Sequence, residues 1–169
     1  MKTSKEQPLI IVNKIQFFIG LSALCLGALV YLTLRSPDQI YFTKFFNIHE
    51  TLYEIQSPIL KTVGRSLPAF LHVFSFSLIT ASFFRYSKKT YAAICTGWFL
   101  VNCAFELGQK YKAQATKLVF DFFDKIPFLE STRNFFLRGT FDWLDLMAFF
   151  LGTVAAFLAL MATSITGLG

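Results

Sequence analysis

A small set of ionisable and amide side chains lies within or beside the apolar segments of this 169-residue sequence. The set comprises His72, Glu106, Gln109, Arg138, Asp142 and Asp145. Such residues are costly inside a membrane, and where they occur they mark ligand sites, ion paths or proton relays. A guanidinium binds phosphate through a fork of hydrogen bonds, while carboxylates and an imidazole can orient a ligand or hold a metal. These residues are the candidates for function, and the surrounding elements must bring them together.

The composition around these residues is that of a membrane protein. Hydrophobic residues make up 54% of the chain and charged residues only 15%, whereas a soluble domain carries about 25% charged residues. The net charge is +6, but the basic residues bracket apolar segments instead of covering one face, so we expect no nucleic-acid partner. Cys25, Cys95 and Cys103 lie in apolar runs without metal-ligand spacing, which indicates packing residues and predicts neither a metal nor a cofactor.

Four apolar segments are long enough to cross a bilayer as helices, which takes about 20 mostly apolar residues. They cover about residues 15–34, 67–84, 90–109 and 141–164. The first is longer than the hydrophobic region of a signal peptide and lacks a good cleavage site, so we interpret it as an uncleaved anchor. The sequence thus predicts an all-α protein in which residues 1–169 form a single membrane domain, a four-transmembrane-helix bundle.

Two connecting segments, 40–56 and 112–137, mix Phe, Ile and Leu with charged residues. The mixture is typical of amphipathic helices that lie in the headgroup region, and we expect Pro58 and Pro127 to end them. These extracytoplasmic loop helices are predicted to contact membrane lipids and at least one other membrane protein. The expected partner contacts are Phe45, Phe46, Phe122 and Phe123, with burial in the lipid interface as the alternative.

Basic residues beside the spans indicate the orientation. The N-terminal segment carries Lys2, Lys5 and Lys14, and the short turn Arg85–Lys89 separates the second and third spans. The density of positive charge predicts that both termini and this turn are cytoplasmic. The number of Lys and Arg residues alone favours the opposite orientation.

Three passes of the chain bring the polar set to the same end of the predicted bundle. His72 follows the start of the second span, Glu106 lies near the end of the third, and Asp145 opens the fourth. Asp145 shares a stripe of small residues with Gly152, which permits close helix packing and turns the acid inward. We therefore expect one pocket, in which Glu106 or Asp145 contacts Arg138 or His72.

Two members of the set also have simpler interpretations. His72 shares a helical face with Ser75 and Ser82, which favours an inward orientation, but a histidine near the end of a span is commonly an interfacial residue. Asp142 stands where the fourth helix begins, and an acid at that position caps the helix and complements its dipole.

The order of three segments resembles the VanZ-like family of small membrane proteins. The segments are LPAFLHVFSFSLI, FLVNCAFELGQ and RGTFDWLDLMAFFLG. The residues that match by type are His72, Glu106, Gln109, Arg138, Asp145 and Gly152. The chain departs from the family in carrying Phe149 in place of an Asn, and in the longer connection from Gln109 to Arg138. The resemblance implies a location in the cell envelope, in the inner membrane of a bacterium.

Three functions fit these observations. The first is a non-enzymatic protein whose outer pocket binds a lipid headgroup or a lipid-linked envelope precursor, with Arg138 on the phosphate and Glu106 and Asp145 orienting the site. The second is a structural or accessory subunit of a larger membrane complex. The third, an intramembrane hydrolase, is disfavoured because the sequence has no HExxH or similar compact motif.

Overall fold

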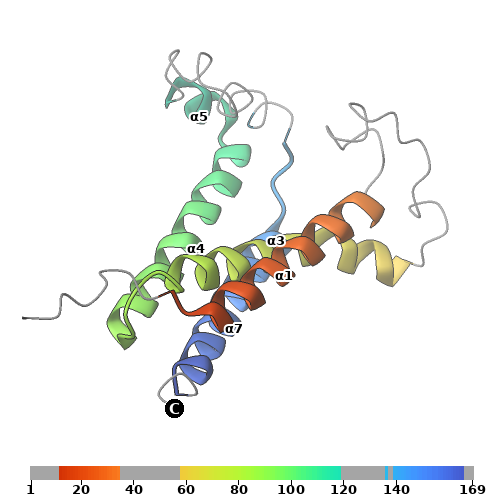
Figure 1. Cartoon of the computed structure of the whole chain (residues 1–169). Coiled ribbons are helices and arrows are strands. Elements are labelled where there is room, and N and C mark those ends of the chain that lie inside the picture. Colours follow the sequence, from red (N-terminus) through yellow and green to blue (C-terminus); the bar gives the residue numbers. More distant parts are fainter. Residues whose placement is uncertain (1–11, 35–57, 119–135, 137–138, 166–169) are drawn as a thin grey trace, which may run out of the picture.

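The computed structural model describes residues 12–34, 58–118, 136 and 139–165, which fold as helices and their connections (Figure 1). The helices are α1 (Lys14–Leu34), α3 (Pro58–Ala81), α4 (Lys88–Lys110), α5 (Lys112–Leu118) and α7 (Trp143–Ile165). No strand occurs in this part of the chain. The predicted all-α class is confirmed for the described residues.

Three of the described helices, α1, α4 and α7, are long and apolar enough to cross a membrane. Their bounds agree with the predicted spans at 15–34, 90–109 and 141–164 to within a few residues. The agreement follows from the uncharged length of each segment, since charged residues at its ends fix where an apolar helix can stop. The chain is therefore compatible with an integral membrane protein.

The second predicted span, 67–84, overlaps a helix that begins and ends earlier in the chain. Helix α3 starts at Pro58, continues through Pro68 and ends at Ala81. Proline suits the first turn of a helix, where its missing N–H would have had no partner. Pro58 thus begins a long helix, and the loop helix at 40–56 that it was expected to end lies outside the described residues. The additional turns bring Arg65 into α3.

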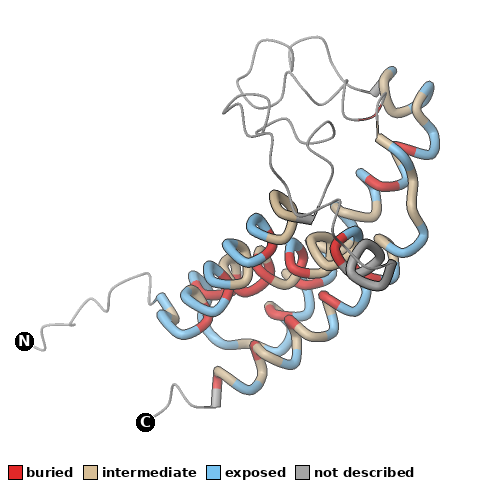
Figure 2. The backbone as a smooth tube through the Cα atoms, turned by 90° about the vertical axis from the view of Figure 1, so that its right-hand side faces the viewer, coloured by how far each residue is buried: buried red, intermediate tan, exposed pale blue. Residues whose placement is uncertain are grey.

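Helix α3 lies at the centre of the structure and contacts α1, α4 and α7. Buried residues occupy the sides of the helices that face one another, and exposed residues occupy the outward sides (Figure 2). The core cluster consists of Leu78, Ala81, Tyr91, Cys95, Ala156 and Leu160. The outward sides carry large apolar residues such as Phe18, Leu100 and Leu158, which suits helices that are surrounded by lipid.

Small residues allow α7 to approach α3 closely. Ala148, Gly152 and Ala156 are buried, as the predicted stripe of small residues requires. A Cβ atom added to Gly152 would lie 2.6 Å from the carbonyl oxygen of Phe70 on α3. The contact is therefore between the two backbones, and only glycine fits at this point.

Three of the long helices, α1, α4 and α7, are joined at one end by a buried polar network, here called the Gln16 network. The side-chain amide of Gln16 donates to the Tyr91 hydroxyl and to the Thr163 hydroxyl, both at 3.1 Å. Ser164 also donates to the Tyr91 hydroxyl, at 3.2 Å. At the same end, the backbone N–H of Asn13 donates to the carbonyl of Ser82 at 2.8 Å.

The Gln16 network also defines the direction of the helices. Helices α1 and α4 begin at this end, whereas α3 and α7 finish there. From it α1 and α4 diverge towards their C-terminal ends (Figure 1). The opposite end, where α4 finishes and α7 begins, is where the sequence places its polar set.

Candidate functional site

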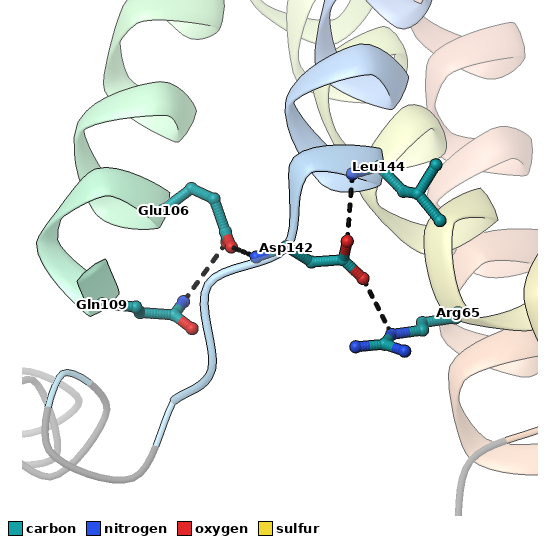
Figure 3. Close-up of polar contacts among 5 residues, drawn as sticks. All are labelled: Arg65, Glu106, Gln109, Asp142 and Leu144. Atoms are coloured by element: carbon teal, nitrogen blue, oxygen red, sulfur yellow. Dashed lines mark hydrogen bonds and ion pairs between the residues drawn. The ribbon is translucent and has the colours of Figure 1, made fainter.

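Four side chains meet at the end opposite the Gln16 network (Figure 3). They are Arg65 from α3, Glu106 and Gln109 from α4, and Asp142, which precedes α7 directly. We call this group the polar cluster. It joins three helices through side chains that are far apart in the sequence.

Asp142 is the residue through which the three helices are connected. Its carboxylate accepts a hydrogen bond from the backbone N–H of Leu144 at 3.0 Å and pairs with Nε of Arg65 at 2.8 Å. Its own backbone N–H donates to the carboxylate of Glu106 at 2.6 Å. Asp142 thus caps α7, which is the simpler of the two roles that the sequence predicted for it. It also forms an ion pair with Arg65 of α3.

Glu106 supplies the buried acceptor of the polar cluster. Its side chain and that of Gln109 are buried, with 5% and 8% of their surfaces exposed. The Gln109 amide donates to the Glu106 carboxylate at 3.4 Å, a contact made possible by their spacing on one helical face. Hydrogen bonds to a buried carboxylate offset part of the cost of removing its charge from water. Glu106 therefore fixes the start of α7 against the end of α4.

The cation of the polar cluster lies at its surface. In the isolated chain, 59% of the Arg65 side chain is exposed but only 15% of the Asp142 side chain. An ion pair with one exposed partner contributes little to stability, about 0–1 kcal/mol. Asp142 therefore holds the Arg65 guanidinium at the surface of the polar cluster.

The structure brings together Glu106, Gln109 and Asp142, and of the other predicted site residues it describes Asp145 and His72. Asp145 is partly buried in the first turn of α7, where its N–H donates to the carbonyl of Asp142. His72 is exposed, and its ring lies against the ring of Phe76, with 4.5 Å between centroids. The burial expected for His72 is therefore not observed, and its expected contact with Glu106 or Asp145 stays a prediction.

The buried face of α3 explains the position of His72. Ser75 and Ser82, which share a helical stripe with it, are both buried. A Cβ atom on Gly20 of α1 would lie 3.0 Å from the carbonyl oxygen of Ser75. This close contact between α1 and α3 leaves room only for small side chains such as serine. The larger imidazole of His72 lies outside the contact.

Several predicted residues lie outside the described part of the chain. These are Arg138 and the expected partner contacts Phe45, Phe46, Phe122 and Phe123. Their assigned roles stay predictions. Among the residues that the structure describes, no group of three or more His, Cys, Asp and Glu side chains could hold a metal ion.

Arg65 was not among the predicted site residues, because a basic residue just before the predicted span 67–84 is typical of the boundary of a span. A signal was present, since Pro58 marks the start of a helix that includes Arg65. Gln16 was missed for a different reason. It follows Lys14 near a span boundary, and its hydrogen-bonding partners Tyr91 and Thr163 are distant in the sequence.

Comparison with models of protein families, with curated proteins and with solved structures finds no match for the chain. The fold and the site therefore define its class by themselves. It is a helical protein with three helices that are long and apolar enough to span a membrane, and a cluster of acidic, basic and amide side chains joins α3, α4 and α7 at one end.

Proposed function

We propose that the chain is a VanZ-like protein of a bacterial inner membrane that binds the phosphate of a lipid headgroup or of a lipid-linked envelope precursor at the polar cluster. In this proposal α3 is the fourth membrane-spanning helix. Its central position against α1, α4 and α7 supports that role, because a helix packed among three spanning helices shares their environment.

The observation that carries the proposal is the geometry of Arg65. Its Nε pairs with a largely buried carboxylate while most of its side chain is exposed. Guanidinium groups bind phosphate through parallel hydrogen bonds, and an ion pair this exposed is readily exchanged or extended. Asp142 orients the cation, and Glu106 holds Asp142 in place through its backbone N–H. Arg138 is proposed as a second cation for the same phosphate.

We expect replacement of Arg65 by glutamine to weaken phosphate-lipid binding about tenfold, the loss of one charged hydrogen-bonding partner. The measurement is retention of phosphatidylglycerol and of a polyprenyl phosphate by the purified protein in native mass spectrometry. Arg85→Gln is the matched control, because Arg85 is exposed in the turn at the opposite end. Retention of phosphatidylglycerol alone would assign the site to bulk lipid headgroups, and retention of the polyprenyl phosphate would assign it to a precursor. Equal binding by both arginine variants and the unchanged protein would contradict the proposal.

The orientation is tested at the turn between α3 and α4. In a variant with Cys25, Cys95 and Cys103 replaced, Ser87→Cys provides one thiol in that turn. We expect a membrane-impermeant maleimide to label it only after the cells are permeabilised, because positive charge at Arg85 and Lys88 retains the turn in the cytoplasm. Efficient labelling of intact cells would reverse the orientation and place the polar cluster at the cytoplasmic surface.

A further inference from the structure

The end of α4 and the start of α7 enclose one lysine with aromatic rings. The ammonium nitrogen of Lys110 lies 5.0 Å from the ring centroid of Phe141, 5.2 Å from that of Trp143 and 5.8 Å from that of Tyr111. All three distances are within the range of about 6 Å for attraction between a cation and an aromatic face. We call these four residues the ring cluster.

The ring cluster lies where two apolar helices reach the edge of their apolar length. Lys110 is the last residue of α4, and Trp143 is the first residue of α7. In the isolated chain Trp143 is 65% exposed and Tyr111 is 53% exposed. Trp and Tyr at the ends of membrane spans lie at the level of the headgroups, and lysine extends its charged end towards water from the same depth.

Three rings restrict the flexible Lys110 side chain. A free lysine loses side-chain entropy when its ammonium is fixed by a ligand. Contacts with Phe141, Trp143 and Tyr111 remove part of that loss in advance, so an anion meets a cation that is already positioned. The ammonium has three hydrogen-bond donors, and the faces of aromatic rings are not strong acceptors. Phosphate oxygens at the membrane surface supply such acceptors.

We infer that the ring cluster is a docking surface for phospholipid, on which Lys110 binds a headgroup phosphate while Trp143 and Tyr111 lie at the level of the glycerol backbone. The surface that occupies the ring cluster is the lipid bilayer itself. The apolar lengths of α4 and α7 support it, because both helices reach this surface at the same end of the structure.

The ring cluster also sets the depth of the polar cluster. Lys110 follows Gln109 directly in the chain, and Phe141 directly precedes Asp142. Anchoring the rings among the headgroups therefore holds Glu106 and its hydrogen bonds at the edge of the hydrocarbon. This inference requires a membrane-spanning protein but does not rest on phosphate binding at Arg65.

The depth of Trp143 gives the first test. The chain contains two tryptophans, so a Trp98→Phe variant reports on Trp143 alone. Reconstituted in phosphatidylcholine vesicles that carry bromine at defined positions of the acyl chain, Trp143 should be quenched most by the bromine closest to the headgroup. Stronger quenching by deep bromines, or by aqueous iodide than by any lipid, would overturn the inference.

The role of Lys110 is tested by lipid preference. In the same single-tryptophan background, we expect Lys110→Gln to reduce the preference for phosphatidylglycerol over phosphatidylcholine about fivefold, the effect of one basic residue at an anionic surface. The matched control is Lys117→Gln, an exposed lysine of α5 outside the ring cluster. Lys110→Arg should restore the preference, because arginine keeps both the charge and the affinity for aromatic faces.

The two proposals fail in different ways. Arg65→Gln should leave the depth of Trp143 and the effect of Lys110→Gln unchanged, whereas Lys110→Gln should retain binding of a polyprenyl phosphate at the polar cluster. If Lys110→Gln and Lys117→Gln change the lipid preference equally, the ring cluster is not a lipid-binding surface. If Arg65→Gln loses binding of the polyprenyl phosphate, the proposed function is supported whatever the two lysine variants show.

Discussion

Replacement of Gly152 by alanine is expected to destabilise the protein by about 2 kcal/mol, within the range for inserting one carbon into a packed interior. The added Cβ would lie 2.6 Å from the carbonyl oxygen of Phe70 and 3.4 Å from its Cα. A flexible side chain could move away from such a contact, but these atoms belong to the backbone of α3. Helices α3 and α7 would have to separate, and contacts along the rest of their length would weaken.

The matched control for this substitution is Gly97→Ala. A Cβ atom at Gly97 on α4 meets nothing within 4 Å, so the same chemical change has no steric cost there. Alanine is also the better helix former, by about 1 kcal/mol, and we expect unchanged or slightly raised stability. The measurement is unfolding in mixed micelles with increasing dodecyl sulfate. Equal midpoints for the two variants would contradict the close approach of α3 and α7.

The helices themselves were predictable because uncharged length is a local property. The bounds of α1, α4 and α7 follow from apolar runs with charged residues such as Lys14 and Lys110 near their ends. Helix α3 was harder, since its first turns are more polar and Pro68 looked like a first-turn residue. The helix in fact starts at Pro58. The same preference of proline for helix N-termini applies, but to the proline that comes before Pro68 in the chain.

The packing faces were predictable only where small residues reveal them. The stripe through Gly152 faces α3 because only small side chains permit that separation. His72 carries no such restriction. Helix α3 has three neighbours, so buried residues occur on most of its sides. The periodicity of the sequence therefore does not show which of its stripes is exposed. The orientation of a single polar residue on such a helix depends on contacts that one sequence does not show.

The depth of the polar cluster could be predicted from the sequence, but the contacts within it could not. Glu106, Gln109 and Asp142 were placed at one depth by counting along the spans, which is reliable for helices of known direction. One hydrogen-bond donor to Glu106 is the backbone N–H of Asp142, and a backbone donor has no signature in residue type. The expected partners were the side chains of His72 and of Arg138, which lies outside the described residues. The cap and the ion pair to Arg65 are made by Asp142.

The contact between Glu106 and Asp142 leads to the second large effect. We expect Glu106→Ala to destabilise the protein by about 3 kcal/mol. The backbone N–H of Asp142 and the amide of Gln109 would both lose their acceptor, and a buried donor left without a partner costs about 1–3 kcal/mol. The missing side-chain atoms also leave a cavity next to the start of α7.

Glu106→Gln separates the hydrogen bond from the charge. The amide oxygen of glutamine can still accept from the N–H of Asp142, and Gln109 can turn its own amide to pair with the new NH₂ group. We therefore expect a loss of about 1 kcal/mol, the difference between a charged and a neutral acceptor. The midpoints of unfolding in mixed micelles measure both variants on one scale.

The order of these two variants decides what Glu106 does. A large loss for alanine and a small one for glutamine means that the carboxylate acts as a hydrogen-bond acceptor that fixes the start of α7. Equal stability of both variants and the unchanged protein would show that water replaces the carboxylate, contrary to its burial at 5% exposure. A loss for glutamine as large as that for alanine would show that the negative charge itself is needed, and would return Arg138 to the role of its ionic partner.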